Sequence, residues 1–252
     1  MKKLLALFLA LVLTLSMVSA LADGEYIAVI SKGFQHQFWQ TVAAGAFDAA
    51  KKYNVEVTFD GPPSESDINI QIDMINAALA KNPVAMALAA LDTESVTEQL
   101  LAAKEKGIPV IGFDSGVPNA PEGTIWSTAS TNNESAGAVA AEEMFAIESI
   151  AAKIAGATPE APVMISCFSQ DATSASVVGR TVGFLAKMTE LLETVHPGAV
   201  AITGHDKYNA PSEKPAAVTI NVTVPASTSP TDCQTSAQGI LSMENLIAIF
   251  CS

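Results

Sequence analysis

Residues 26–53 read YIAVISKGFQHQFWQTVAAGAFDAAKKY, and this stretch decides the fold class. Tyr26–Ile30 is an apolar run bounded by polar residues, a pattern that predicts a buried strand. From Phe38 to Ala50 apolar residues recur every four positions, which predicts one face of a helix. The polar loop between them, residues 32–37, would lie at the carboxyl end of the strand. Ligands bind at that end in open α/β sheets, so we expect a binding loop here.

Two aromatic residues, Phe38 and Trp39, follow this loop directly. Their ring faces can stack on a polar ring while the loop side chains form hydrogen bonds with it. The same two side chains can instead pack against the sheet, and their position alone leaves both interpretations open.

The composition is that of a globular protein with an acidic surface. Of 252 residues, 49% are hydrophobic and 15% are charged, which suffices for one large or two modest domains. The net charge of −13 argues against nucleic acid and anionic membranes as partners. Residues 1–22 contain two of the lysines and no acid, so the chain without them has a net charge of −15, from 11 basic and 26 acidic residues.

Residues 1–22 are predicted to be a cleaved signal peptide. A basic start precedes an apolar run, Leu4–Val18, of the length of a signal-peptide core. Small residues follow, with Ala20-Leu21-Ala22 as the favoured cleavage motif and Val18-Ser19-Ala20 as the second. Because no cysteine follows the run directly, a lipid anchor is not expected. The product is therefore predicted to be periplasmic or secreted, with no direct membrane insertion.

The cysteine and histidine content predicts neither a disulfide scaffold nor a metal centre. Three cysteines are too few for a scaffold, although export permits one bridge in any pairing of Cys167, Cys233 and Cys251. Cys167 and Cys251 stand in or beside apolar strand-like runs, so we expect both to be buried, inert thiols. The three histidines have no partner at metal-ligand spacing.

Strands and helices are predicted to alternate along the whole chain, which indicates parallel sheets with right-handed crossovers. The predicted strands cover residues 26–30, 55–60, 84–91, 108–113, 124–127, 163–168, 199–203, 218–224 and 246–250. Helices are predicted between most of them, including one long helix that begins at Asn132 or Asn133 and runs towards Ala155.

This alternation predicts two similar α/β lobes, residues 23–127 and residues 128–252. The second lobe repeats the opening unit of the first, because a strand at 163–168 leads through a polar loop into a helix. Gly183-Phe184 on that helix parallels Gly45-Ala46-Phe47 on the opening helix.

Four segments in this order resemble the ribose/galactose-type periplasmic sugar-binding proteins of ABC transporters. They are YIAVISKGFQHQFW (26–39), KNPVAMALAALDTESV (81–96), GIPVIGFDSGVP (107–118) and the SAS…GRTVGF segment (174–184). The resemblance covers essentially the whole mature chain. It implies two α/β lobes joined by three crossing strands, with the sugar held in the cleft between them. The fold also resembles the effector domain of LacI-type repressors, but here a signal peptide replaces the helix-turn-helix.

The resemblance implies four ligand-binding residues in the first lobe. Phe38 and Trp39 match the aromatic pair that stacks on a sugar ring, whose C–H faces are apolar and slightly positive. His36 stands where relatives often place a hydrogen-bonding side chain. Asp114 matches an acid that accepts hydrogen bonds from sugar hydroxyls, although a turn aspartate is the alternative role for it.

Two further residues are implied in the second lobe. Arg180 matches an arginine that lies three residues before a Gly-Phe pair and donates in a planar fork to sugar oxygens. The alternative for Arg180 is a surface salt bridge. Tyr208 matches an aromatic residue that faces the sugar from the second lobe.

Two departures from the family pattern argue against ribose as the ligand. Ala89 replaces an asparagine at the end of the third strand, and Ser115 replaces an arginine after the acid. Asp92 can compensate for the lost polar groups, although capping the next helix is the favoured role for it. The ligand could be a pentose, a hexose, inositol or another small polyol.

The chain also stops before the family pattern ends. Relatives continue beyond the strand at Leu246–Phe250 with further strands and two more crossings between the lobes. The resemblance therefore implies a C-terminally truncated chain with an incomplete second lobe and hinge. Unpaired strand edges would then lower its stability or weaken ligand binding.

The sequence contains no recognisable nucleophile–base pair, metal cluster or phosphate-binding loop. It therefore predicts a binding protein and not an enzyme, and it predicts no cofactor. The resemblance implies a monomer that closes on a sugar and delivers it to a membrane permease. A receptor that presents the closed form to a chemoreceptor or sensor kinase is the alternative, as is a non-functional fragment. An exported hydrolase is disfavoured, because Ser166 and Ser169 lack a G-x-S-x-G setting.

Overall fold

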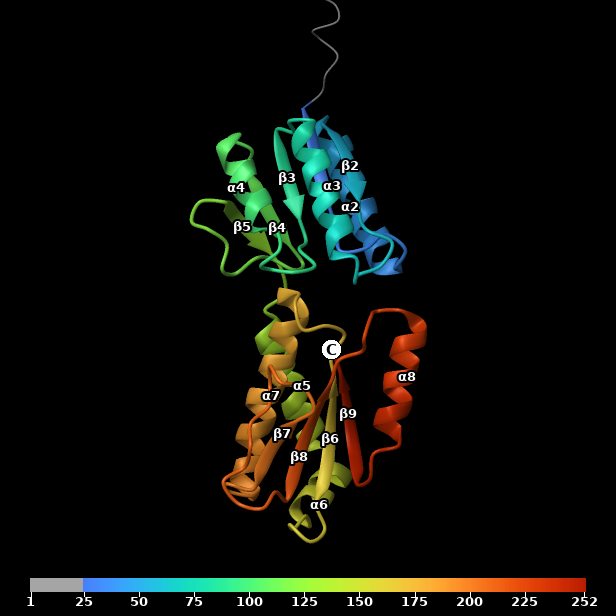
Figure 1. Ribbon diagram of the computed structural model, residues 1–252, viewed down its shortest axis with the longest axis vertical. Helices are drawn as coiled ribbons and strands as arrows, with labels where there is room; N and C mark the ends of the chain where they lie inside the picture. The colour runs from blue at the N-terminus through green and yellow to red at the C-terminus, as the bar shows by residue number, and fades with distance from the viewer. Residues whose placement is uncertain (1–24) are drawn as a thin grey trace, which may run out of the picture.

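The predicted alternation of strands and helices forms two separate parallel sheets in the computed structural model, which describes residues 25–252. Figure 1 shows the N-terminal lobe (blue to green) above the C-terminal lobe, with the chain crossing between them after the last strand of the first sheet. The predicted signal peptide, residues 1–22, lies outside the described residues. Within the described range, no helix is both long enough and apolar enough to cross a membrane.

The N-terminal lobe is a five-stranded parallel sheet with the strand order β2-β1-β3-β4-β5. Its elements are β1 (Tyr26–Ile30), α2 (Gln37–Tyr53), β2 (Glu56–Asp60), α3 (Ile68–Ala80), β3 (Ala85–Leu88), α4 (Thr97–Glu105), β4 (Val110–Phe113) and β5 (Ile125–Ala129). Successive side chains of a strand point to opposite faces of its sheet. Accordingly, Ala28 and Ile30 pack against α3 and α4, whereas Val29 packs against α2.

The C-terminal lobe is a four-stranded parallel sheet with the strand order β7-β8-β6-β9. Its elements are α5 (Asn133–Ala146), α6 (Glu148–Ala155), β6 (Val163–Phe168), α7 (Ala175–Val195), β7 (Val200–Thr203), β8 (Val218–Thr223), α8 (Pro230–Leu241) and β9 (Leu246–Cys251). Its core includes Cys167, Phe184 and Ile220, all fully buried. Burial raises the pKa of the Cys167 thiol to about 12, so it stays protonated at neutral pH, as predicted for an inert thiol.

The structure corrects three expectations about local structure. The single helix predicted between residues 132 and 155 is broken at Ile147, whose extended backbone ends α5 and begins α6, and α6 then buries Ile154 in the core. Cys251 is exposed and not buried, because β9 is the edge strand of its sheet. Asp92 does not cap α4, which begins at Thr97. Its carboxylate instead accepts from the backbone amides of a turn before that helix.

The buried face of α2 differs from the face that the sequence predicted. Trp39, Ala43 and Ala50 are its buried residues, whereas Phe38 is 48% exposed. Consecutive helical residues lie about 100° apart around the axis, so only one of the two neighbouring aromatic rings can face the sheet. Packing selects Trp39, which makes edge-on contacts with Phe38 and with Phe113 of β4.

Candidate ligand-binding site

A cleft lies where the two lobes meet, and the loops that follow β1 and β6 both reach it. These loops begin at Ser31 and Ser169, each of which is fully buried. The carboxyl ends of parallel strands are where open α/β sheets place their ligands. The fold therefore brings the carboxyl ends of the strands of both sheets together at one interface between the lobes (Figure 1).

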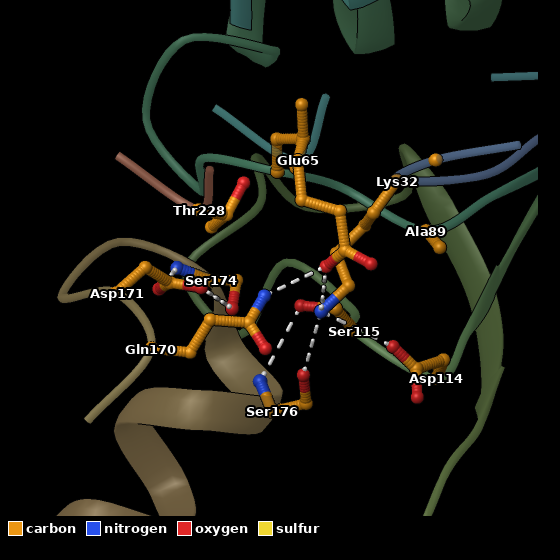
Figure 2. Close-up of polar contacts among 12 residues, drawn as sticks. Lys32, Glu65, Ala89, Asp114, Ser115, Gln170, Asp171, Ser174, Ser176 and Thr228 are labelled. Atoms are coloured by element: carbon orange, nitrogen blue, oxygen red, sulfur yellow. Dashed lines mark hydrogen bonds and ion pairs between the residues drawn. The ribbon is translucent and has the colours of Figure 1, made fainter. Parts of the chain in front are cut away.

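Lys32 lies at the centre of this interface. Its side chain is 5% exposed, and its ammonium donates a hydrogen bond to Ser176 Oγ of the other lobe at 3.1 Å. The same ammonium lies 3.4 Å from Asp114 Oδ2 and 3.8 Å from Glu65 Oε2. Figure 2 shows these groups converging on the lysine. An ammonium taken out of water needs charged and hydrogen-bonding partners, and these three residues supply them.

Glu65 connects the two lobes through its two carboxylate oxygens. Oε1 accepts a hydrogen bond of 2.7 Å from the indole N–H of Trp39 in its own lobe. Oε2 accepts one of 2.9 Å from the side-chain amide of Gln170 in the other lobe (Figure 2). Hydrogen bonds to a charged acceptor are stronger than neutral ones, so Glu65 both orients the indole and joins the lobes.

Further hydrogen bonds cross the cleft around this pair. The Thr228 amide donates to Ser66 Oγ at 2.9 Å, and the Thr173 hydroxyl donates to the Leu91 carbonyl at 3.2 Å. The backbone amide of Ser176 donates to the side chain of Ser115 at 3.3 Å. Polar side-chain and backbone groups of the two lobes therefore contact one another across the cleft.

Three cavities formed by residues within the described range 25–252 lie along this interface. The largest, about 540 Å³, is lined by Gly33–His36, Trp39, Pro63–Glu65, Gln170, Thr228–Pro230 and Cys233. A second, about 330 Å³, is lined by Asp114, Gly116–Pro118, Thr128, Ser130–Glu134, Ala175, Ser176 and Gly179. A third, about 290 Å³, shares Glu65, Gln170 and Thr228 with the first. Each cavity takes residues from both lobes, and the smallest of these volumes is near the lower end for small-molecule sites.

The predicted first-lobe residues take different positions in this cleft. Trp39 lines the largest cavity while its ring is buried against the sheet, at 2% exposure. His36 lines the same cavity and caps α2, because its Nδ1 accepts from the Phe38 amide at 3.2 Å. Asp114 lines the second cavity, has a left-handed backbone at φ 53° and forms an ion pair with Lys32. Phe38 is not among the residues that line the three cavities.

Neither of the predicted second-lobe residues, Arg180 and Tyr208, lines any of the three cavities. Arg180 donates through Nη1 to Asn133 Oδ1 at 2.8 Å, which ties α7 to the first residue of α5. Tyr208 packs against the core of the C-terminal lobe, and its buried hydroxyl has no hydrogen-bond partner among the described residues. Burial, followed by the negative charge of Asp171, raises the pKa of Tyr208 to about 12.

Residue-by-residue comparison with the family pattern missed Lys32, Glu65, Gln170 and Ser176. Lys32 and Gln170 occupy the same place in the two lobes, the second loop position after β1 and after β6 respectively. The binding loop predicted at 32–37 contained Lys32, and the same rule about the carboxyl ends of strands would have indicated the loop of Gln170, so loop position was the available signal. No local pattern marks Glu65 or Ser176.

The fold and the cleft define a two-lobed α/β protein of the kind that holds a ligand between its lobes. Residues 27–252 match the family model of the periplasmic binding protein domain. The chain therefore belongs to that family, and the predicted fold class is confirmed.

Three relatives show the range of similarity. The D-allose-binding periplasmic protein of Escherichia coli (strain K12) is 29% identical over 139 residues, which are 54% of this chain and 44% of the relative. A solved structure described as an ABC transporter, LacI family transcriptional regulator from Brachyspira murdochii is 36% identical, with a TM-score of 0.69. An ABC transporter solute-binding protein from Agrobacterium vitis with bound D-fucose is 25% identical, with a TM-score of 0.68.

The chain spans only part of the length of these relatives. It covers 65% of the Brachyspira murdochii structure and 66% of the Agrobacterium vitis structure, while 90% and 89% of this chain are aligned. Against the curated D-allose-binding protein the matched share is 44% of that protein.

Trp39→Phe is expected to lower the free energy of unfolding by about 1.5–3 kcal/mol, because phenylalanine cannot donate to Glu65 Oε1. Urea unfolding followed by circular dichroism measures the change. The matched control is Trp126→Phe, since Trp126 is 74% exposed on β5 and should change stability by less than about 0.5 kcal/mol. Equal effects of the two substitutions would refute the structural role of the Trp39–Glu65 bond.

Proposed function

We propose that this protein is an extracytoplasmic solute-binding protein that captures a small sugar or polyol between its lobes and delivers it to an ABC-type permease. The observation that carries the proposal is the polar cleft formed jointly by both lobes at their strand ends, in a chain of the periplasmic binding protein family. Two relatives support a sugar as the ligand class, because one is a D-allose-binding protein and the other is a solute-binding protein with bound D-fucose.

The cleft chemistry suits a polyhydroxylated ligand. Carboxylate acceptors (Glu65, Asp114) and amide or hydroxyl groups (Gln170, Ser176) converge on it from both lobes. A sugar presents many hydroxyl groups that both donate and accept hydrogen bonds, so it can replace the direct bonds between the lobes with bonds through the ligand. His36 and Trp39 would complete the first-lobe wall of the largest cavity.

The proposed mechanism is hinge closure of a monomer. In an open form the lobes separate and the bonds from Lys32 and Glu65 to the other lobe are broken. Ligand contacts to both lobes then stabilise the closed form, because a ligand shifts such an equilibrium by its differential affinity for the two states. The closed form would dock on the permease. We also propose ligand-binding roles for Phe38, Arg180 and Tyr208, as the family resemblance implies, although none of the three lines the cavities described above.

A thermal-shift panel tests the proposed function. Purified protein is melted with D-allose, D-fucose, common pentoses and hexoses and myo-inositol, and in parallel with amino acids. A ligand at 100 times its Kd should stabilise the fold by about 2.7 kcal/mol and raise the melting temperature by about 5–10 °C. Calorimetric titration of each responding compound then gives the affinity. Stabilisation by amino acids and by no sugar or polyol would refute the proposal.

A further inference from the structure

The described walls of the three cavities carry several acidic side chains, and their one basic side chain is that of His36. The residues that line the three cavities include the carboxylates of Glu65, Asp114, Glu134 and Asp171. No lysine or arginine is among these lining residues. A ligand that enters the cleft therefore meets negative charge on several sides, and the field between low-dielectric walls is stronger than on an open surface.

The cation at the centre of the cleft, Lys32, is already engaged. Its side chain is 5% exposed, and it contacts Ser176, Asp114 and Glu65 at 3.1, 3.4 and 3.8 Å. A ligand anion could reach this ammonium only by displacing a carboxylate that is part of the protein. Lys32 therefore balances the protein's own acids and does not offer a free positive charge.

The carboxylates of Glu65 and Asp114, which both lie near Lys32, differ in how many of their oxygens accept hydrogen bonds. Both oxygens of Glu65 accept hydrogen bonds from neutral donors, Trp39 and Gln170, as well as facing Lys32. Asp114 has Lys32 near Oδ2, while no hydrogen bond from the described residues reaches its Oδ1. The Asp114 side chain is 25% exposed and lines the second cavity, so it presents an acceptor to a ligand.

We propose that this cleft selects its ligand by charge. It binds a polyhydroxylated ligand that carries an amino group more tightly than the neutral counterpart, and it rejects the acidic counterpart. One ammonium faces two carboxylates, so an excess negative charge remains, and a ligand amine beside Asp114 and Glu134 neutralises it. A ligand carboxylate would add like charge beside the same acids, which binding sites disfavour strongly. This inference rests on the proposed function and narrows its ligand class.

Two matched series test the charge selection by calorimetric titration of the purified protein at pH 7 and low ionic strength. One series is D-galactose, D-galactosamine and D-galacturonate; the other is D-glucose, D-glucosamine and D-glucuronate. The expected order of affinity is amine, then neutral, then acid, with about tenfold between neighbours, as expected for charges a few ångströms apart in a partly screened site. Raising the salt concentration should compress this order.

A pair of variants separates the cleft from the overall acidity of the chain. Asp114→Asn keeps the shape of the side chain and removes its charge, so the amine-to-neutral affinity ratio should fall towards one. Asp48→Asn removes an exposed acid on α2, outside the cavity walls, and should leave that ratio unchanged. An equal fall in both variants would mean that net charge, and not the cleft, sets the preference, which overturns the inference.

The outcomes distinguish this inference from the proposed function. If neutral sugars bind and the acidic forms bind as tightly or more tightly, charge selection is overturned while the proposed function stands. If the amine forms bind no better than the neutral forms, the inference is likewise overturned. If no sugar or polyol binds in either series or in the thermal-shift panel, the proposed function fails and this inference fails with it.

Discussion

Gly183→Ala is expected to lower the free energy of unfolding by about 1–3 kcal/mol, although alanine is the better helix former. Gly183 lies in α7 where that helix crosses α5, and a Cβ atom there would overlap the carbonyl oxygen and backbone of Glu134. Gly137 of α5 meets α7 in the same way, with its added Cβ against the backbone of Arg180 and Phe184. Because the added Cβ atom would overlap backbone atoms, a rotamer change cannot relieve the overlap. One of the two helices would have to move away from the other.

Gly183→Ala should also alter the shape of the cleft between the lobes. α5 begins directly after the chain crosses between the lobes, and residues 130–134, which join that crossing to the first turn of α5, line the second cavity. Pushing α5 away from α7 would therefore displace this cavity wall, and weaker sugar binding should accompany the lower stability.

The matched control is Gly45→Ala in the middle of α2. A Cβ atom there meets no atom within 4 Å, so only the helix propensity changes and stability should rise by about 0.4–1 kcal/mol. Urea unfolding of both variants, followed by circular dichroism, gives the two changes with opposite sign. A Gly183→Ala protein as stable as the parent would refute the close α5–α7 contact.

Lys32→Met is expected to destabilise the closed arrangement of the lobes and to lower the free energy of unfolding by about 2 kcal/mol. The substitution leaves Asp114 and Glu65 close together without their shared cation, and removes the donor to the buried Ser176 hydroxyl. Removing one partner of a buried pair costs up to about 3–5 kcal/mol. The carboxylates keep some contact with water, at 19% and 25% exposure, so we expect a smaller cost.

Two measurements check the lysine prediction. Urea unfolding gives the change in stability, and small-angle scattering without ligand should show a larger radius of gyration because the lobes separate more easily. Lys51→Met, at an exposed position in the last turn of α2, is the control and should change stability by less than about 0.5 kcal/mol. Adding Asp114→Asn to Lys32→Met should restore part of the loss, because it removes one of the uncompensated charges. A radius of gyration and a stability unchanged in Lys32→Met would contradict the bridging role.

Local patterns predicted most of the secondary structure, and the reasons are visible in particular elements. A helix was predicted between the strands at 55–60 and 84–91, and α3 lies there. Its apolar residues Ile68, Ile72 and Ile75 recur at a spacing near four, which is a property of the chain itself. The break at Ile147 escaped prediction, because the alanine-rich sequence on both sides of it favours helix. The exposure of Cys251 also escaped, since the position of a strand within its sheet depends on which strands pair.

By itself the sequence determined the alternation of strands and helices, the two α/β lobes and the family, and it predicted a binding loop at 32–37 after the first strand. Only the tertiary structure decided which aromatic of the Phe38-Trp39 pair is buried, because the rotation of a helix about its axis is set by packing. Only the tertiary structure joined Glu65 to Gln170, which are 105 residues apart, and placed Lys32 between the lobes. Such contacts depend on how two separately folded sheets meet, and no local pattern in the chain records that geometry.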